Sequence, residues 1–407
     1  MSLLPFSPPR MDEKITEAVT EVLLSGWITT GPKTKLFEKK LTEYTGSKST
    51  LCLNSATAGL EIMLRWFGVG EGDEVIVPAY TYSATANVCM HVGARPVLVD
   101  TNPDDFNISI NAIRAAITDR TKVIMPVDFA GMPCDMDAIM QLVNSKEMVL
   151  KFRPANDIQQ RLGRIMVLSD AAHSIGAVYK GKRTGSLCDV AVFSFHAVKN
   201  LTTAEGGAVA LNFPEPFDNE AIYKYLCIKT LHGQNKDALA KTQKGGWRYD
   251  IIEPGYKCNM MDIQAAIGLV ELERYDNDNL VRRKQIVQMY NDTFANEKWA
   301  QIPMHHDENR ESSYHLYPLR LKGVSEEQRD KIIDEIFNHD ISVNVHFIPL
   351  PLLSFYKNYG FKMEDYPVAY DNYSREITLP LYYQLSDENV QRVISAVKES
   401  VNRILNS

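Results

Sequence analysis

The stretch VAVFSFHAVKNLTTAEGGAVAL, residues 190–211, places a single lysine between two apolar runs. Short apolar runs bounded by glycine and polar residues are typical of buried strands. Runs 190–195 and 208–211 therefore predict two core strands, with Lys199 on the connection between them. Burial at such a place favours the neutral amine, which is the form that condenses with an aldehyde. A solvated loop lysine is the other interpretation that this stretch alone allows.

A third apolar run, 165–168, is followed by Ser169 and Asp170. An aspartate that follows a strand can lie at the carboxyl edge of a parallel sheet, where open α/β folds place their ligands. A carboxylate at that edge can keep the pyridine nitrogen of pyridoxal 5′-phosphate (PLP) protonated, which makes the ring an electron sink. Lys199 and Asp170 then have complementary roles, one as nucleophile and the other as partner of the ring nitrogen.

Strand and helix patterns alternate through the first 270 residues. Apolar runs predict strands at 49–53, 74–77, 96–100 and 122–127, with helical patterns such as 56–64 and 111–118 between them. This alternation is typical of an α/β fold with a mostly parallel sheet. The glycine-rich segment 68–72 precedes a strand instead of following one, which does not support a dinucleotide-binding fingerprint.

Two strand ends carry candidate ligand contacts. Asn54, Ser55, Ala56 and Thr57 form the turn into helix 56–64, and a helix N-terminus attracts phosphate through its free N–H groups and its dipole. Serine and threonine are also common N-caps, so the same residues fit a helix start with no ligand. Tyr82, after strand 74–77, can stack on a flat ring or pack in the core.

Composition limits the class of protein. The 407 residues are 45% hydrophobic and 23% charged, which is typical of a soluble globular enzyme, and the net charge of −7 argues against nucleic-acid or membrane partners. The six cysteines lack CxxC spacing, so we expect reduced packing residues, neither disulfides nor zinc ligands. No signal peptide or membrane-spanning run is evident, so we expect a cytoplasmic protein that binds no metal.

The chain divides by pattern into two domains. A long helix from 263 past 283 is a plausible spine between a large domain, 1–270, and a small α+β domain, 271–407, with further elements at 314–321, 325–338, 341–348 and 386–405. Within the large domain, residues 144–163 are polar and exceed what one connection needs. We expect a surface insertion. The sequence leaves open whether this insertion acts as a lid or has no role.

Several motifs occur in one order along nearly the whole chain: SGWITTGP (25–32), NSATAGL (54–60), GDEVIVPAYTYSAT (72–85), DAAHSIGA (170–177), SFHAVKNLTTAEGG (194–207), GYKCNMMDIQAAIG (255–268), SSYHLYPLRL (312–321) and LPLYYQLS (379–386). Together they resemble the DegT/StrS-type sugar aminotransferases. They are most similar to the enzymes that make UDP-4-amino-4-deoxy-L-arabinose. The resemblance implies PLP-dependent transferase fold type I, aspartate aminotransferase-like, with a mostly parallel seven-stranded sheet and a small C-terminal domain.

The resemblance also implies roles for single residues. Lys199 would bind PLP covalently, Asp170 would pair with its ring nitrogen, and Tyr82 and His173 would lie against the ring. The phosphate would be held by Ala56, Thr57 and Ser194, and by Asn259 of the other subunit of a homodimer with shared active sites. Segments that line the sugar-nucleotide site in the family contain Thr29, Thr30, His315 and His346.

The implied reaction moves an amino group from L-glutamate, which leaves as 2-oxoglutarate, to a keto group of a nucleotide-linked sugar. C4 is the expected position, and the product would enter cell-surface polysaccharide or lipopolysaccharide. A 3-keto-sugar aminotransferase and a PLP-binding sensor or scaffold without turnover remain alternatives. A dehydratase branch of the family has histidine in place of the lysine, and Lys199 argues against it. Segments 144–163 and 346–351 depart from the arabinose-type pattern and leave the sugar open.

Overall fold

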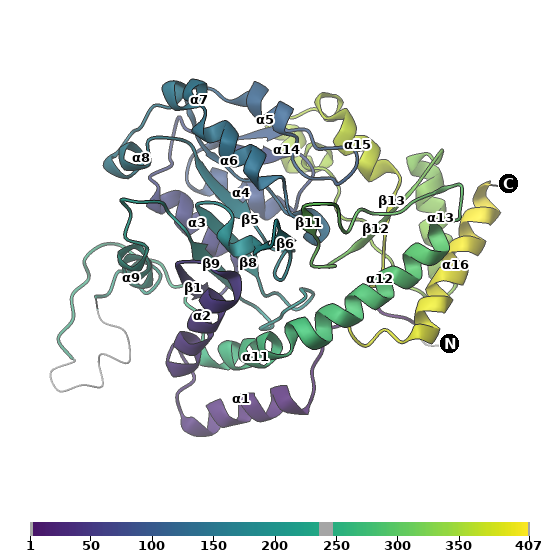
Figure 1. The fold of residues 1–407 in the computed structure, drawn as a ribbon, viewed down its shortest axis with the longest axis horizontal. Helices are drawn as coiled ribbons and strands as arrows, with labels where there is room; N and C mark the ends of the chain where they lie inside the picture. The colour runs from purple at the N-terminus through teal and green to yellow at the C-terminus, as the bar shows by residue number, and fades with distance from the viewer. Residues whose placement is uncertain (1–2, 236–246, 406–407) are drawn as a thin grey trace.

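The computed structural model describes residues 3–235 and 247–405, and a seven-stranded sheet lies at its centre (Figure 1). The strand order is β1-β9-β8-β5-β4-β2-β3, and β9 is the one strand that runs antiparallel to its neighbours. This arrangement confirms the predicted α/β fold. The strands are β1 (Ser49–Leu53), β2 (Glu74–Pro78), β3 (Arg95–Val99), β4 (Thr121–Ile124), β5 (Met166–Asp170), β8 (Val190–Ser194) and β9 (Gly207–Leu211).

Strand β8 shows how both faces of the sheet are buried. Successive side chains of a strand point to opposite faces. Val190 and Val192 belong to one apolar cluster, whereas Ala191 and Phe193 belong to the other. Helices therefore cover both sides, as a parallel sheet requires. They are α2 (Pro32–Thr45), α3 (Ala56–Trp66), α4 (Ser83–His91), α5 (Ile110–Ala116), α6 (Met136–Asn144), α9 (Asn219–Lys229) and α11 (Asp262–Glu273).

The C-terminal part is reached along α11, a short π-helical turn at Tyr275–Asn279, and α12 (Leu280–Phe294), which together run along one side of the molecule (Figure 1). A three-stranded antiparallel sheet follows, covered by helices. The domain boundary near residue 270 stays a prediction. The elements are β10 (Ala300–Gln301), β12 (Tyr317–Leu321), β13 (Glu376–Leu379), α13 (Glu326–Asn338), α14 (Ser354–Tyr359), α15 (Pro367–Ser374) and α16 (Asp387–Leu405).

Segment 341–348 is not a strand, although its apolar pattern resembles those of the strands. Its pairing is limited to isolated bridges of Ile341 with Leu4 and of Asn344 with Thr378. The first of these ties the start of the chain to the C-terminal part, while α1 (Glu13–Ser25) packs against α11. The chain start and segment 341–348 thus lie together, and both reach the cavity described below.

The predicted insertion is folded. It forms α7 (Lys146–Lys151) and α8 (Asp157–Leu162), and the buried Gln159 side chain donates to the carbonyl oxygen of Phe67 at 2.9 Å. Met148 and Phe152 are buried in the apolar core. No residue of 144–163 lines the main cavity, so the structure gives no support to a lid.

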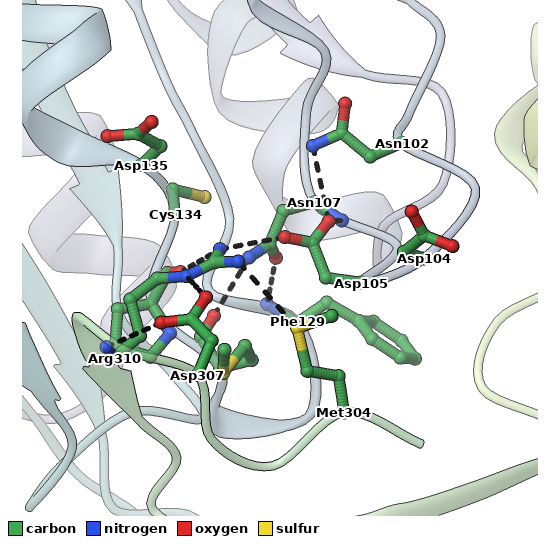
Figure 2. A network of polar contacts seen from close by, with 12 residues as sticks. Asn102, Asp104, Asp105, Asn107, Phe129, Cys134, Asp135, Met304, Asp307 and Arg310 are labelled. Carbon is green, nitrogen blue, oxygen red and sulfur yellow. Dashed lines mark hydrogen bonds and ion pairs between the residues drawn. The ribbon is translucent and has the colours of Figure 1, made fainter. Parts of the chain in front are cut away.

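A dense polar network joins the short strand β11 (Arg310–Glu311) to loops of the large sheet (Figure 2). The Arg310 guanidinium donates to Asp105 and Asp307, each at 2.7 Å, and to the carbonyl of Pro133 at 3.0 Å. β11 also extends the hairpin of β6 (Val178–Tyr179) and β7 (Lys182–Arg183). These contacts fix the position of the segment that follows, which carries His315.

Four of the six cysteines, Cys52, Cys89, Cys134 and Cys188, are buried free thiols, in agreement with the predicted packing role. None of the helices within residues 3–235 and 247–405 has the length and apolar character needed to span a membrane. The same part of the chain holds no cluster of three or more side chains arranged to bind a metal ion.

Candidate active site

A cavity of about 420 Å³ lies at the carboxyl ends of β5 and β8. Lys199, Asp170 and His173 line it, together with residues from the turn before α3 and from segment 341–348. The carboxyl edge of a parallel sheet is where a ligand is expected in this class of fold. The cavity therefore brings the predicted lysine and aspartate to one place.

Lys199 lies on the connection from β8 to β9, which is folded back by a hydrogen bond from Thr203 N to the carbonyl of Phe195 at 2.8 Å. Burial lowers the pKa of Lys199 to about 8, and the charge of Asp170 opposes that shift. A substantial fraction of the amine is consequently neutral near physiological pH. The solvated-lysine interpretation is wrong for this structure, and the amine is suited to attack an aldehyde.

Asp170 is buried at the end of β5, and burial raises its pKa. Two donors oppose the shift: Thr85 Oγ1 at 2.8 Å from Oδ2, and the Ala172 N–H at 3.2 Å from Oδ1. Thr81 in turn is 2.9 Å from Thr85, so the hydroxyls form a short chain behind the carboxylate. Such a carboxylate is fixed in orientation, and a cationic ring nitrogen in the cavity would favour its ionised form.

Three histidines, His173, His315 and His346, also line the cavity. Burial, with the nearby charge of Lys199, lowers the pKa of each, that of His346 to about 3. The imidazoles are therefore neutral. His173 Nδ1 accepts from the Ala130 N–H at 3.2 Å, which leaves its proton on Nε2.

The partner of His315 differs from that of His173. Nδ1 of His315 lies 2.8 Å from Oδ1 of Asn200, and an amide oxygen can only accept, so this nitrogen carries the proton. The Asn200 amide is fixed in turn because it donates to the carbonyl of Ser313 at 2.7 Å. The two rings, with centroids 4.4 Å apart, thus present different atoms to the cavity.

The opposite end of the cavity is the N-terminus of α3. Ser55 caps the helix by accepting from Ala58 N at 3.1 Å, and Ala56 and Thr57 supply first-turn N–H groups that have no partner within the helix. A Cβ on Gly207 would lie 2.5 Å from Ala56 N, so glycine permits β9 to approach this turn. With Ser194 alongside, the residues form a cradle that fits a phosphate group.

Tyr82 lines the cavity with 63% of its surface exposed, so the structure excludes the packed-core interpretation. Thr29, Thr30 and Asn259 do not line the cavity of the single chain. Asn259 Nδ2 instead donates to Thr30 Oγ1 at 2.6 Å, on a neighbouring surface. The structure thus gathers nine of the twelve predicted site residues in one cavity and leaves these three outside it.

The sequence contains no signal for some residues that complete the site. Thr85 holds Asp170, Asn200 orients His315, and Phe6 stacks on His346 with ring centroids 5.6 Å apart. Each acts through a tertiary contact between segments distant in the chain. An isolated threonine, asparagine or phenylalanine carries no periodicity or spacing that would have identified it.

Comparison with known proteins agrees with this geometry. The model of the DegT/DnrJ/EryC1/StrS aminotransferase family matches residues 9–398. The chain belongs to that family. Among curated relatives of the aminotransferase, an uncharacterized protein of Methanocaldococcus jannaschii is 41% identical, with 98% of both chains covered. The spore coat polysaccharide biosynthesis protein SpsC of Bacillus subtilis is 38% identical over 98% of this chain and 97% of SpsC.

Solved structures extend the comparison. A putative sugar aminotransferase of Streptococcus pneumoniae, in its PMP form, superposes on this aminotransferase with a TM-score of 0.95 and 49% identity, covering 98% of this chain and 100% of that one. Helicobacter pylori PseC, an aminotransferase of pseudoaminic acid biosynthesis, gives a TM-score of 0.85 with 28% identity over 99% and 100% of the two chains. The protein is a PLP-dependent sugar aminotransferase of fold type I.

Proposed function

We propose that this aminotransferase takes the amino group from L-glutamate, releases 2-oxoglutarate, and transfers the group to the C4 keto position of a nucleotide-linked sugar. The observation that carries the proposal is the pairing of Lys199, a half-buried lysine of lowered pKa, with the fixed carboxylate of Asp170 in one cavity. The match to SpsC, a spore coat polysaccharide biosynthesis protein, supports a role in making cell-surface polysaccharide, and we propose that the enzyme works in the cytoplasm.

The cavity residues fit PLP in both polarity and position. Asp170 would hold the ring nitrogen, Tyr82 and His173 would lie beside the ring, and Lys199 would be the point of covalent attachment. The phosphate would lie at Ala56, Thr57 and Ser194, where the helix N-terminus and the close approach of Gly207 form a cradle. When bound, PLP supplies an electron sink for the carbon that bears the nitrogen.

The chain's own groups supply the proton transfers. Nζ of Lys199 would take the proton from Cα of the donor amino acid and deliver it to the carbon that receives the amino group, because its lowered pKa keeps part of the amine in the basic form. Asp170 is held in place by Thr85 and would keep the cofactor nitrogen protonated. His173 would offer its Nε2–H as a hydrogen-bond donor to a group bound in the cavity. The ring stays neutral, since its pKa is well below the ordinary value.

The nucleotide sugar would enter past His315 and His346, which line the cavity, and meet Thr29 and Thr30 from the neighbouring surface. We further infer a homodimer in which Asn259 reaches the phosphate of the partner's cofactor. In support, Ile28, Ile252 and Met261 leave 49%, 53% and 43% of their surfaces exposed in the single chain, near Thr29 and Asn259 in sequence.

Shared sites can be tested by mixing two inactive variants, Lys199→Ala and Asn259→Ala. Random exchange of subunits should restore about a quarter of the wild-type activity, because half the dimers are hybrids and each hybrid has one intact site. Each variant incubated alone is the control. Mixtures no more active than the variants alone would refute the shared site.

The amino transfer itself is tested by two half-reactions followed by absorbance. L-Glutamate should convert the long-wavelength band of the lysine-bound cofactor to the shorter-wavelength band of the aminated form, and a 4-keto nucleotide sugar should restore the first band. Recovery with a 3-keto sugar alone would move the proposal to that position. A protein that binds PLP and completes neither half-reaction would contradict the proposed activity.

A further inference from the structure

A buried carboxyl group lies behind His346, on the side away from the cavity. Glu376 and Thr378 are two residues apart on β13, so their side chains point to the same face of the strand. Both are completely buried. Thr378 Oγ1 forms a short hydrogen bond with Oε1 of Glu376, and it also lies 3.0 Å from Nδ1 of His346.

The backbone closes this arrangement into a ring of contacts. The His346 N–H donates to the other carboxyl oxygen, Oε2 of Glu376, at 3.1 Å, and the Tyr80 hydroxyl donates to the His346 carbonyl. The imidazole lines the cavity and stacks against Phe6. Its Nε2 has no hydrogen-bond partner within residues 3–235 and 247–405.

The number of available protons links the state of Glu376 to that of His346, because Thr378 lies between them. Thr378 has a single hydroxyl proton. If Glu376 is ionised, that proton goes to the carboxylate, so Oγ1 accepts from Nδ1–H and Nε2 keeps a lone pair. If Glu376 is neutral, the carboxylic proton goes to Oγ1 and the hydroxyl donates to Nδ1, so Nε2 carries the proton.

We propose that Glu376 and Thr378 are positioning residues that set which nitrogen of His346 carries the proton, and thereby whether the ring presents a donor or an acceptor to the cavity. A proton taken up at Nε2 is balanced by one that arrives at Glu376 through Thr378, so the imidazole stays neutral in both states. This suits a ring whose charged form is disfavoured by burial and by Lys199. The consequence for sugar binding rests on the proposed function, whereas the switch itself does not.

The charges around Glu376 permit both its ionised and its neutral state. Burial raises the pKa of Glu376 to about 8, opposed by the hydrogen bonds from Thr378 and the His346 N–H and by the more distant charges of Arg329 and Arg320. Neither guanidinium group pairs with the carboxylate: Arg329 donates to the Tyr373 and Glu376 carbonyls, and Arg320 to the carbonyls of Pro103 and Asp104 and to Asn372.

The other neighbours do not compete for this proton. Tyr80, the remaining titratable group beside Glu376, has its pKa raised by burial and stays neutral. On the cavity side His346 faces Lys199 and the neutral rings of His173 and His315. Lys199 also has a pKa of about 8 but takes no part in this chain of hydrogen bonds, and Glu376 is the carboxyl group here that titrates near neutral pH.

Neutron diffraction from crystals of the PLP-loaded enzyme tests the inference without any sugar or turnover. Data are needed at about pH 6 and about pH 10, roughly two units to either side of the expected change. In the wild type, deuterium should occupy Nε2 of His346 and the Glu376 carboxyl at the lower pH, and Nδ1 at the higher pH. Deuterium on the same nitrogen at both values would overturn the proposal.

Two variants sharpen the result. Glu376→Gln should fix the proton on Nε2 at both pH values, because the amide oxygen accepts from the His346 N–H while the amide N–H donates to Thr378. Thr378→Ser, which retains the hydroxyl, is the control and should switch as the wild type does. A Glu376→Gln protein whose His346 still exchanges its proton between the nitrogens with pH would contradict the proposal. Failure of the proposed amino transfer would leave these readings unchanged.

Discussion

Two polar regions of this aminotransferase shift the pKa of a basic side chain in opposite directions. In the network around Arg310, the guanidinium contacts two carboxylates and a carbonyl, and although burial alone would lower the pKa of Arg310, the bonds to Asp105 and Asp307 raise it (Figure 2). In the active-site cavity, burial lowers the pKa of Lys199 and no carboxylate forms a direct ion pair with it in the described chain.

The difference separates structural charge from reactive charge. A cation with matched partners is held in its charged form and keeps two segments of chain together. A cation deprived of partners is shifted toward its neutral form, which is the reactive one for an amine. The Arg310 network lies between β11 and the large sheet. It therefore positions the segment that leads to His315, which lines the cavity beside Lys199.

The largest effect on activity is expected from a substitution of Lys199, a lysine that has no carboxylate ion-pair partner among the described residues. Lys199→Ala should reduce turnover by at least about 10³-fold, because both the attachment point and the proton carrier are lost, while PLP still binds in the cavity. Steady-state rates and the absorbance of the protein with PLP measure the two effects. The unfolding midpoint should stay near that of the wild type. Activity equal to the wild type would refute the role of Lys199.

In the Arg310 network, a substitution should change the stability of the protein and not its chemistry. Arg310→Met should lower the free energy of unfolding by about 3 kcal/mol, since it leaves the buried Asp105 without its cation. Urea denaturation followed by circular dichroism measures this. The pair Arg310→Met with Asp105→Asn is the matched control and should lose less than the sum of the single changes. Unchanged stability together with lost activity would reverse the proposed division between the regions.

The pH dependence of PLP capture measures the reactive state directly. The neutral fraction of Lys199 rises about tenfold per pH unit below its pKa, so the capture rate of apo protein should climb with pH and level off above about 8. Stopped-flow absorbance gives the rate. Because the charge of Asp170 raises the pKa of the lysine, Asp170→Asn should move the levelling point to lower pH. A rate that keeps climbing toward pH 10.5, the ordinary lysine value, would show an unperturbed amine.

A smaller effect concerns Glu376, whose pKa in the folded protein lies above its unfolded value of about 4.5. The folded state then holds more protons than the unfolded state between about 4.5 and about 8, so stability should fall as pH rises through that range. The slope is at most about 1.4 kcal/mol per pH unit for one proton. Unfolding free energies across this range, compared with Glu376→Gln, isolate the contribution. Parallel curves for the two proteins would exclude it.

Much of the large sheet could be predicted because its strands are apolar runs of few residues bounded by polar turns, as at 49–53 and 190–194. Burial on both faces forces this pattern. A similar apolar pattern at 341–348 does not form a strand. There the apolar side chains pack in an irregular segment that lies beside the cavity, and apolar content alone does not distinguish such a segment from a strand.

The site divides in a similar way. Lys199 and Asp170 could be inferred from their place after core strands, whereas the roles of His315 and His346 came from resemblance alone. Glu376 was missed because nothing in the sequence around it is unusual, and Thr85 was missed because the motif that contains it does not show which residue its hydroxyl contacts. Their importance arises from contacts across the fold, and a single sequence does not report contacts between distant segments.

The bridge between Leu4 and Ile341 has a practical consequence for handling this enzyme. Because Phe6, two residues further on, lines the cavity and stacks on His346, an affinity tag fused close to Leu4 would begin only a few residues along the chain from the cavity wall. Kinetic work on the untagged protein, or on protein from which such a tag has been cleaved, should therefore give a truer Michaelis constant for the sugar substrate.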